Sequence, residues 1–254
     1  MDRPPEGRVR AAVFNNAVWC DSVCRALDCD TDFVDGLWIN LSPSPPFYSN
    51  AITLTRDDRD AQMRRIGRLA DEGLPAGWSV KDAFNALDLT PLGFHILFEA
   101  DWLALPAAGT PSRTGVNEVR WERVTTEPEL TAWEAAWRRA PANELDEGSA
   151  PPRMFVPALL DDPDIAFLSA GGTEGIVGVV VGNRSDDGSG PVAGVSNIAL
   201  PVEDGEAHIA GAIGAVGATF PHLPLVGYER GADLVAMREL GFEPLGSLRV
   251  WISA

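Results

Sequence analysis

The chain has 254 residues and a formal net charge of −17, and these two properties exclude several classes of function. The length suffices for one large domain or two small ones, each with its own hydrophobic core. A strongly acidic surface repels phosphate backbones and anionic lipid, so we expect neither nucleic acid nor a membrane as partner. No apolar run approaches the roughly 20 residues that cross a bilayer, and Met1–Arg10 lacks the apolar segment of an export signal. The composition therefore predicts a cytoplasmic globular protein.

Three cysteines lie in and just after the first predicted helix, at Cys20, Cys24 and Cys29. A metal site would need further soft or imidazole ligands, and all three histidines of the chain are distant in sequence. Cys20 and Cys24 are spaced to share one helix face, so we expect both to be buried as small apolar residues. The sequence thus predicts no metal site.

The next segments predict a hairpin over Phe33–Leu41, a strand over Asn50–Leu54 and a helix within Arg56–Arg68. The basic residues of that helix alternate with aspartates, which is typical of a solvated helix face and not of a nucleic-acid site. Pro106–Gly115 then has the composition of a linker.

The second half of the chain contains clearer element signals. A glycine-joined hairpin, a third strand, a glycine-rich helix, a short strand, a helix ending at Gly241 and a last strand follow in order. Their expected ranges are Ile165–Ala170, Gly175–Gly182, Val192–Leu200, Ala207–Phe220, Leu225–Glu229, Ala232–Leu240 and Leu248–Ile252. The glycines within the helix, at Gly211, Gly214 and Gly217, indicate close packing and do not form a nucleotide-binding fingerprint.

The two halves repeat one pattern at a separation of roughly 148 residues. The matched positions are Leu54 with Leu200, Leu74-Pro75 with Leu223-Pro224, and Leu92-Gly93-Phe94 with Leu240-Gly241-Phe242. Upstream, Trp19 resembles Trp133 at a shorter separation, because the second half carries an insert, Pro141 to Pro163, after its first helix. We interpret this repetition as a duplication. The predicted fold class is α/β (α+β): two modules, each a mixed, mostly antiparallel sheet flanked by helices, spanning residues 1–105 and 119–254 with a linker at 106–118.

The element order of the second module, together with the segment Ala236–Gly246, resembles the Gcn5-related N-acetyltransferase (GNAT) superfamily. In that family a Gln/Arg-x-x-Gly-x-Gly/Ala loop binds the pyrophosphate of acetyl-coenzyme A, assisted by a helix N-terminus. The matching residues here are Val202–Ala207. Gly205 and Ala207 keep the pattern, whereas Val202 replaces Gln/Arg and three acids occupy the loop. The resemblance implies acetyl-CoA or another acyl-CoA as cofactor, bound by Ile198, Ala199, Leu200, Val202, Gly205, Glu206, Ala207 and His208.

The resemblance leaves the catalytic residues open. Many family members have a tyrosine proton donor where this chain has Met237, which has no proton to donate. Glu229 and Tyr228 are the remaining titratable candidates near the strand ends. In the first module Arg59 stands at the loop's glycine position, so we expect no coenzyme there.

Two functions are consistent with these observations. The first is an acyl-CoA-dependent N-acetyltransferase acting on a small cationic amine, which Gly205 and Ala207 favour. The second is a catalytically decayed GNAT-fold protein that serves as a binding or interaction module, which Val202, the acidic loop and Met237 favour. Resemblance of fold does not decide between them.

Overall fold

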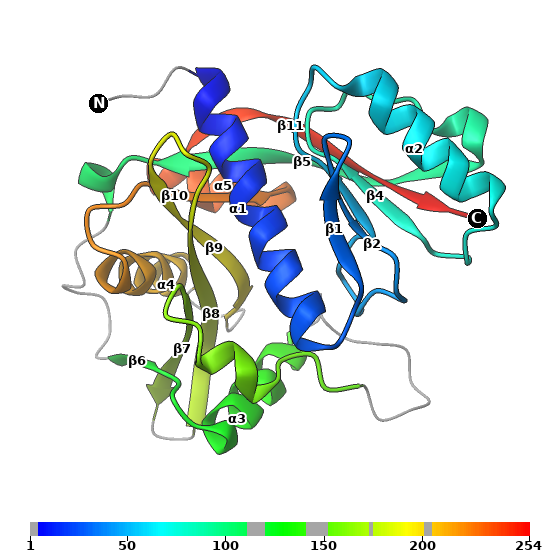
Figure 1. Cartoon of the computed structure of the whole chain (residues 1–254). Helices are drawn as coiled ribbons and strands as arrows, with labels where there is room; N and C mark the ends of the chain where they lie inside the picture. The colour runs from blue at the N-terminus through cyan, green and yellow to red at the C-terminus, as the bar shows by residue number, and fades with distance from the viewer. Residues whose placement is uncertain (1–4, 111–119, 141–151, 173–174, 201–204) are drawn as a thin grey trace.

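The computed structural model describes residues 5–110, 120–140, 152–172, 175–200 and 205–254 (Figure 1). The first half of the chain forms α1 (Pro5–Ala26), β1 (Thr31–Val34), β2 (Leu37–Asn40), β3 (Ala51–Thr53), α2 (Arg59–Asp71), β4 (Ser79–Asp82) and β5 (Phe94–Leu105). The second half forms β6 (Arg120–Arg123), α3 (Glu127–Arg138), β7 (Ile165–Gly172), β8 (Gly175–Asp186), β9 (Pro191–Ala199), α4 (Gly205–Thr219), β10 (Leu225–Glu229), α5 (Gly231–Glu239) and β11 (Glu243–Ser253).

All described strands belong to one sheet, with the order β1-β2-β3-β4-β11-β5-β10-β9-β8-β7-β6. This differs from the expected pair of separate sheets, because the last strand of each half pairs with the other half. β11 lies between β4 and β5, antiparallel to both, and β5 in turn pairs with β10. Most pairings are antiparallel, and the two parallel pairs, β3 with β4 and β9 with β10, occupy corresponding places on either side of the central β5–β11 pair.

Local sequence explains several element boundaries. Asp35 and Gly36 both have positive φ, 53° and 72°, as required at the two central positions of the tight turn between β1 and β2. Thr126 caps α3 and forms a reciprocal capping box with Glu129. Gly93 and Gly241, with φ of 83° and 92°, adopt the left-handed conformation, Gly93 immediately before β5 and Gly241 two residues before β11.

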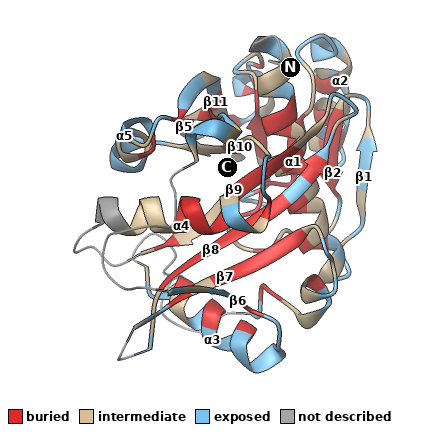
Figure 2. Ribbon diagram, turned by 90° about the vertical axis from the view of Figure 1, so that its left-hand side faces the viewer, coloured by how far each residue is buried: buried red, intermediate tan, exposed pale blue. Residues whose placement is uncertain are grey.

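The hydrophobic core differs between the two faces of the sheet (Figure 2). On one face, α1 and α3 cover a single core that runs through both halves and includes Trp38, Trp102 and Trp133. On the other face, α4 and α5 cover one core and α2 covers a second. Side chains alternate between the faces along each strand, so Ala100 and Trp102 lie on the α1 face whereas Leu103 and Leu105 lie on the α5 face.

The predicted elements of the second half are confirmed, with differences only at their ends. β11 is longer than expected, because it pairs with β5 along almost its whole length. In the first half, the segment that matches α5 is only a short 3-10 turn, Thr90–Leu92. None of the described helices is both long and apolar enough to cross a membrane.

Candidate functional site

The strands β9 and β10 run parallel at one end and then part. Their register pairs Leu225 with Ala193 and Val226 with Gly194, and no further pairing joins these two strands. Beyond Val195, β9 continues along β8, while Tyr228 and Glu229 of β10 continue along β5. The backbone groups on the facing edges of 196–199 and 227–229 therefore have no strand partner across this gap. Backbone N–H and C=O groups that are shielded from water require a hydrogen-bond partner.

A β-bulge lies on the β9 edge of this gap. Ser196 pairs with Val181 and Ala199 with Val179, so β9 has one residue more than β8 in this stretch. Asn197 lies in the bulge with a φ of 52°, in the left-handed region. A bulge re-aims the backbone next to it. The indole of Trp19, from α1, donates a hydrogen bond to Asn197 Oδ1 at 3.1 Å.

The residues that the GNAT resemblance implies for the coenzyme follow directly along this edge. Ile198 and Leu200 are half-buried and Ala199 is buried. Val202 lies outside the described residues. Gly205 opens α4, and Glu206, Ala207 and His208 form its first turn. The structure thus brings together the end of β9 and the N-terminus of a 15-residue helix, where backbone N–H groups and the helix dipole favour an anion.

The two predicted catalytic candidates, Tyr228 and Glu229, project from opposite faces of β10. The Tyr228 ring lies on the α1 face and meets Trp102 edge-on, with 5.3 Å between ring centroids. Glu229 is directly opposite Asp101 of β5, on the α5 face. Burial raises the pKa of the Glu229 carboxyl to about 8, and the negative charge of Asp233 adds to this while Arg230 opposes it. Glu229 can therefore hold or release a proton near neutral pH.

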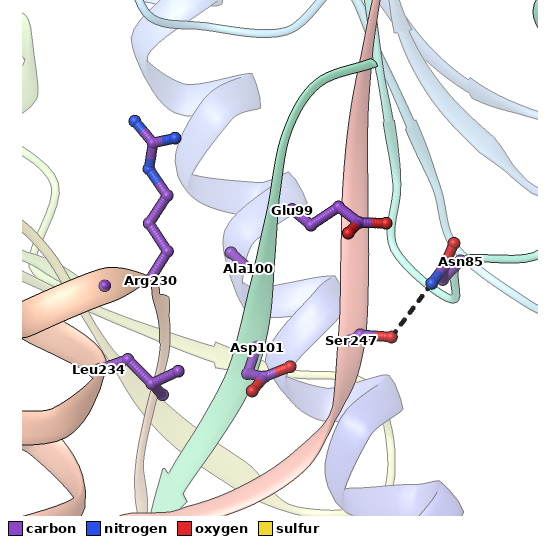
Figure 3. Close-up of a pocket in the computed structure, with 8 residues that line it drawn as sticks. Asn85, Glu99, Ala100, Asp101, Arg230, Leu234 and Ser247 are labelled. Carbon is purple, nitrogen blue, oxygen red and sulfur yellow. Dashed lines mark hydrogen bonds between the residues drawn. The ribbon is translucent and has the colours of Figure 1, made fainter.

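A polar groove of about 320 Å³ lies between α5 and the middle of the sheet, and Asp101, the strand partner of Glu229, lines it (Figure 3). In Figure 3 the carboxylates of Glu99 and Asp101 lie between α5 and a hydrogen-bonded pair, Asn85 and Ser247. In that pair Asn85 Nδ2 donates to Ser247 Oγ at 3.3 Å. The groove is also lined by Ala100, Arg230, Gly231 and Leu234.

Two residues near the gap were not predicted from the sequence. Lys81, the only lysine of the chain, is buried on β4 and donates hydrogen bonds to Asn16 Oδ1 at 2.8 Å and to the Tyr228 hydroxyl at 3.2 Å. Tyr48 is 8% exposed, and its hydroxyl has no hydrogen-bond partner among the described residues. In the sequence, Lys81 and Tyr48 stand out only because their residue types are rare, since the chain has a single lysine and two tyrosines.

The corresponding pair in the first half, β3 and β4, does not part. Their ladder joins Ala51 with Val80 and Ile52 with Lys81. The Thr53 hydroxyl then accepts a hydrogen bond from the Ala83 N–H at 2.8 Å, which prolongs the contact beyond the ladder. The helix that follows β3 begins at Arg59, after Asp58, and not at a glycine.

The remaining predicted positions are core residues. Met237 is buried in α5 and packs in the core of that face. Cys20 and Cys24 are buried and not disulfide-bonded, and burial raises the pKa of both thiols. Within the described ranges, no group of three or more His, Cys, Asp or Glu side chains is arranged to hold a metal ion.

Comparison with known proteins identifies the fold. No family model and no curated protein matches the sequence. Among solved structures, a GCN5-related N-acetyltransferase from Kribbella flavida superposes with a TM-score of 0.62 at 17% identity, covering 96% of this chain and 95% of that one. A GCN5-related N-acetyltransferase from Sphaerobacter thermophilus superposes with a TM-score of 0.58 at 12% identity, covering 98% of this chain and 91% of that one. Saccharomyces cerevisiae N-myristoyltransferase with bound myristoyl-CoA superposes with a TM-score of 0.50 at 9% identity, covering 89% of this chain and 62% of that one. The chain has the GNAT fold, and in the first two cases the likeness extends through both halves.

Proposed function

We propose that this chain is an acyl-CoA-dependent N-acyltransferase whose coenzyme lies between β9 and β10. The observation that carries this proposal is the parting of these two strands next to the Asn197 bulge and the N-terminus of α4. The gap offers unpaired strand N–H groups for the thioester, and the helix end offers N–H groups for the pyrophosphate. Gly205 is the residue type that allows close backbone approach to a phosphate.

In this proposal the acceptor is a small cationic amine that enters from the groove on the α5 face. Glu99 and Asp101 supply negative charge there, as the overall charge of −17 does over longer distances. Glu229 lies on the strand between the groove and the gap, because β10 borders β9 on one side and β5 on the other. With its raised pKa, Glu229 is suited to accept the proton that the ammonium group must lose before it attacks.

We further propose that the two halves are duplicated modules, with residues 106–118 joining 1–105 to 119–254. In support, the parallel pairs β3–β4 and β9–β10 occupy matching places in the strand order. Gly93-Phe94 and Gly241-Phe242 also match in detail, since both glycines are left-handed and both phenylalanines are buried at 3% exposure. In this interpretation only the second module keeps a coenzyme site.

The alternative is a protein with the same fold that binds or interacts without catalysis. The buried Met237 and the acids Glu203, Asp204 and Glu206 favour this alternative, since the acids would repel a pyrophosphate. Glu203 and Asp204 lie outside the described residues, so the repulsion is argued from charge alone. Each such pair of like charges costs about 1 kcal/mol where water screens it well, and more in a closed site.

The deciding experiment measures the melting temperature with and without millimolar acetyl-CoA. A ligand at 100 times its Kd stabilises the folded state by about 2.7 kcal/mol, a shift of several degrees for a chain of this size. Replacing Glu203, Asp204 and Glu206 by Gln, Asn and Gln should enlarge the shift if the loop binds the coenzyme.

The matched control neutralises Asp57, Asp58 and Asp60 in the corresponding loop of the first half, and this change should leave the shift as it is. Release of thiol from acetyl-CoA in the presence of a panel of small amines then tests turnover. Absence of any shift in both the wild type and the neutralised variant would refute the coenzyme site.

A further inference from the structure

Residues of the first half contact both edges of the gap in the second half. On the β9 edge, Trp19 Nε1 donates to Asn197 Oδ1 at 3.1 Å. On the β10 edge, Lys81 Nζ donates to the Tyr228 hydroxyl at 3.2 Å. These two contacts join residues 178 and 147 positions apart in sequence, so neither arises from local structure. The geometry of the gap therefore depends on the first half of the chain.

Lys81 is buried and makes specific side-chain contacts, unlike a lysine on the surface. Its side chain reaches Tyr228 from β4, with β11 and β5 lying between the two strands. The ammonium also stands 4.4 Å from the centroid of the Tyr228 ring, where the negative ring face attracts a cation. Burial of an ammonium is costly unless hydrogen bonds satisfy it. Asn16 and Tyr228 supply those bonds, which holds the Tyr228 ring in one orientation.

Tyr48 is the third contribution of the first half. It lies between β2 and β3, in the same core as Trp19, Cys20 and Val226. Burial raises the pKa of its phenol well above the ordinary value of 10, and the thiol of Cys20 adds to the shift, whereas hydrogen bonding with the Asn197 side chain opposes it. The hydroxyl therefore keeps its proton. Asn197, whose Oδ1 already accepts from Trp19, interacts with this hydroxyl, but no hydrogen bond of ordinary geometry satisfies it within the described protein. A buried donor without a partner calls for an explanation.

Ser196 repeats this feature on the other side of the same bulge. Its hydroxyl is also shielded from solvent without a hydrogen-bond partner among the described residues, and it immediately precedes Asn197 in β9. Both hydroxyls thus lie next to Asn197, at the bulge where β9 and β10 part. Placed there, they are suited to a polar group that enters the gap from outside the protein.

We propose that the first half completes the acyl-transfer site, with Tyr48 donating a hydrogen bond to the carbonyl of the bound acyl thioester, and with Trp19 and Lys81 as positioning residues that hold the two edges of the gap. This inference rests on the proposed function, because it assumes an acyl-CoA between β9 and β10. It assigns a role to a module that lacks a coenzyme loop of its own. It also accounts for the single lysine and both tyrosines of the chain.

The test compares two ligands, acetyl-CoA and free coenzyme A, by titration calorimetry on the full chain and on Tyr48→Phe. The variant keeps the ring and removes only the unpartnered hydroxyl, so its melting temperature should equal or exceed that of the wild type. Affinity for acetyl-CoA should fall on the order of tenfold, as for one lost hydrogen bond. Affinity for free coenzyme A, which has no acyl carbonyl, should not change.

A second variant, Trp19→Phe, removes the N–H that holds Asn197 and should weaken both ligands, because it alters the edge of the gap itself. Trp251→Phe is the control, since its indole nitrogen is also buried without a partner but lies in the core of α2, away from the gap. It should change neither affinity. If Tyr48→Phe binds both ligands like the wild type, the inference is wrong. If the wild type binds neither ligand, the proposed function itself fails.

Discussion

The two parallel strand pairs of this sheet occupy matching places in the strand order and differ in whether the strands part. β3 and β4 stay together, because Thr53 continues the contact to Ala83 after the ladder ends. β9 and β10 separate after two paired residues, at a bulge that β3 lacks in its three-residue length. The two pairs therefore share a place in the strand order, but only β9 and β10 leave facing strand edges without a strand partner.

The first half nevertheless supports the strands that part. α1 of the first half crosses the second half's strands β8 and β9, and it is held there by a reciprocal pair of side-chain bonds. Asn15 donates to the Asn183 carbonyl at 2.9 Å, and Asn183 donates to the Asn15 carbonyl at 3.3 Å. Gly194 of β9 leaves the space for this contact.

The largest effect is expected from filling that space with Gly194→Ala. The added methyl would overlap Asn15 Oδ1 and Asn183 Oδ1, which their hydrogen bonds hold in place. Overpacking of this kind costs up to about 3 kcal/mol, a loss of roughly 10 °C in the melting temperature for this chain length. Gly171→Ala on β7, where a methyl would meet no atom within 4 Å, is the control and should be tolerated. Equal melting temperatures for the two variants would contradict the role given to α1.

A smaller, pH-dependent effect is expected from Glu229→Gln. The folded protein holds the Glu229 proton up to about pH 8, whereas the unfolded chain releases it near the ordinary pKa of 4.5. Between these values the unfolded state binds fewer protons, so rising pH lowers the stability of the wild type. The variant lacks this penalty.

Its gain in melting temperature over the wild type should therefore be close to zero at pH 4.5 and reach its maximum, a few degrees, near pH 8. Glu99→Gln removes a carboxylate from the same face but loses the ion pair with Arg249, so it should give no gain at either pH. A gain for Glu229→Gln that is constant across this window would show that the carboxyl is not buried in solution.

Much of the fold could be predicted because it depends on local signals. The strand Leu225–Glu229 has the predicted ends, and Gly241 ends its helix as expected. The exchange of β5 and β11 between halves could not be predicted, because the residues of a strand do not by themselves select which neighbour it pairs with. The shortening of the Thr90–Leu92 segment to a single turn likewise depends on tertiary packing.

The candidate site was predicted only where one strand or one loop carries it. Gly205, Tyr228 and Glu229 follow from the second half's own pattern. Tyr48 and Lys81 belong to the half whose loop predicts no coenzyme, and they reach the gap only because the sheet is continuous and α1 lies across it. Contacts over 147 residues have no signature in a single sequence.

The most direct test of the account is the stoichiometry of acetyl-CoA binding to the full chain, measured by titration calorimetry. The account predicts one molecule per chain, because only the β9–β10 pair opens while the β3–β4 pair stays closed. Two molecules per chain would show that the first half also binds, and no binding would show that the gap is not a coenzyme site.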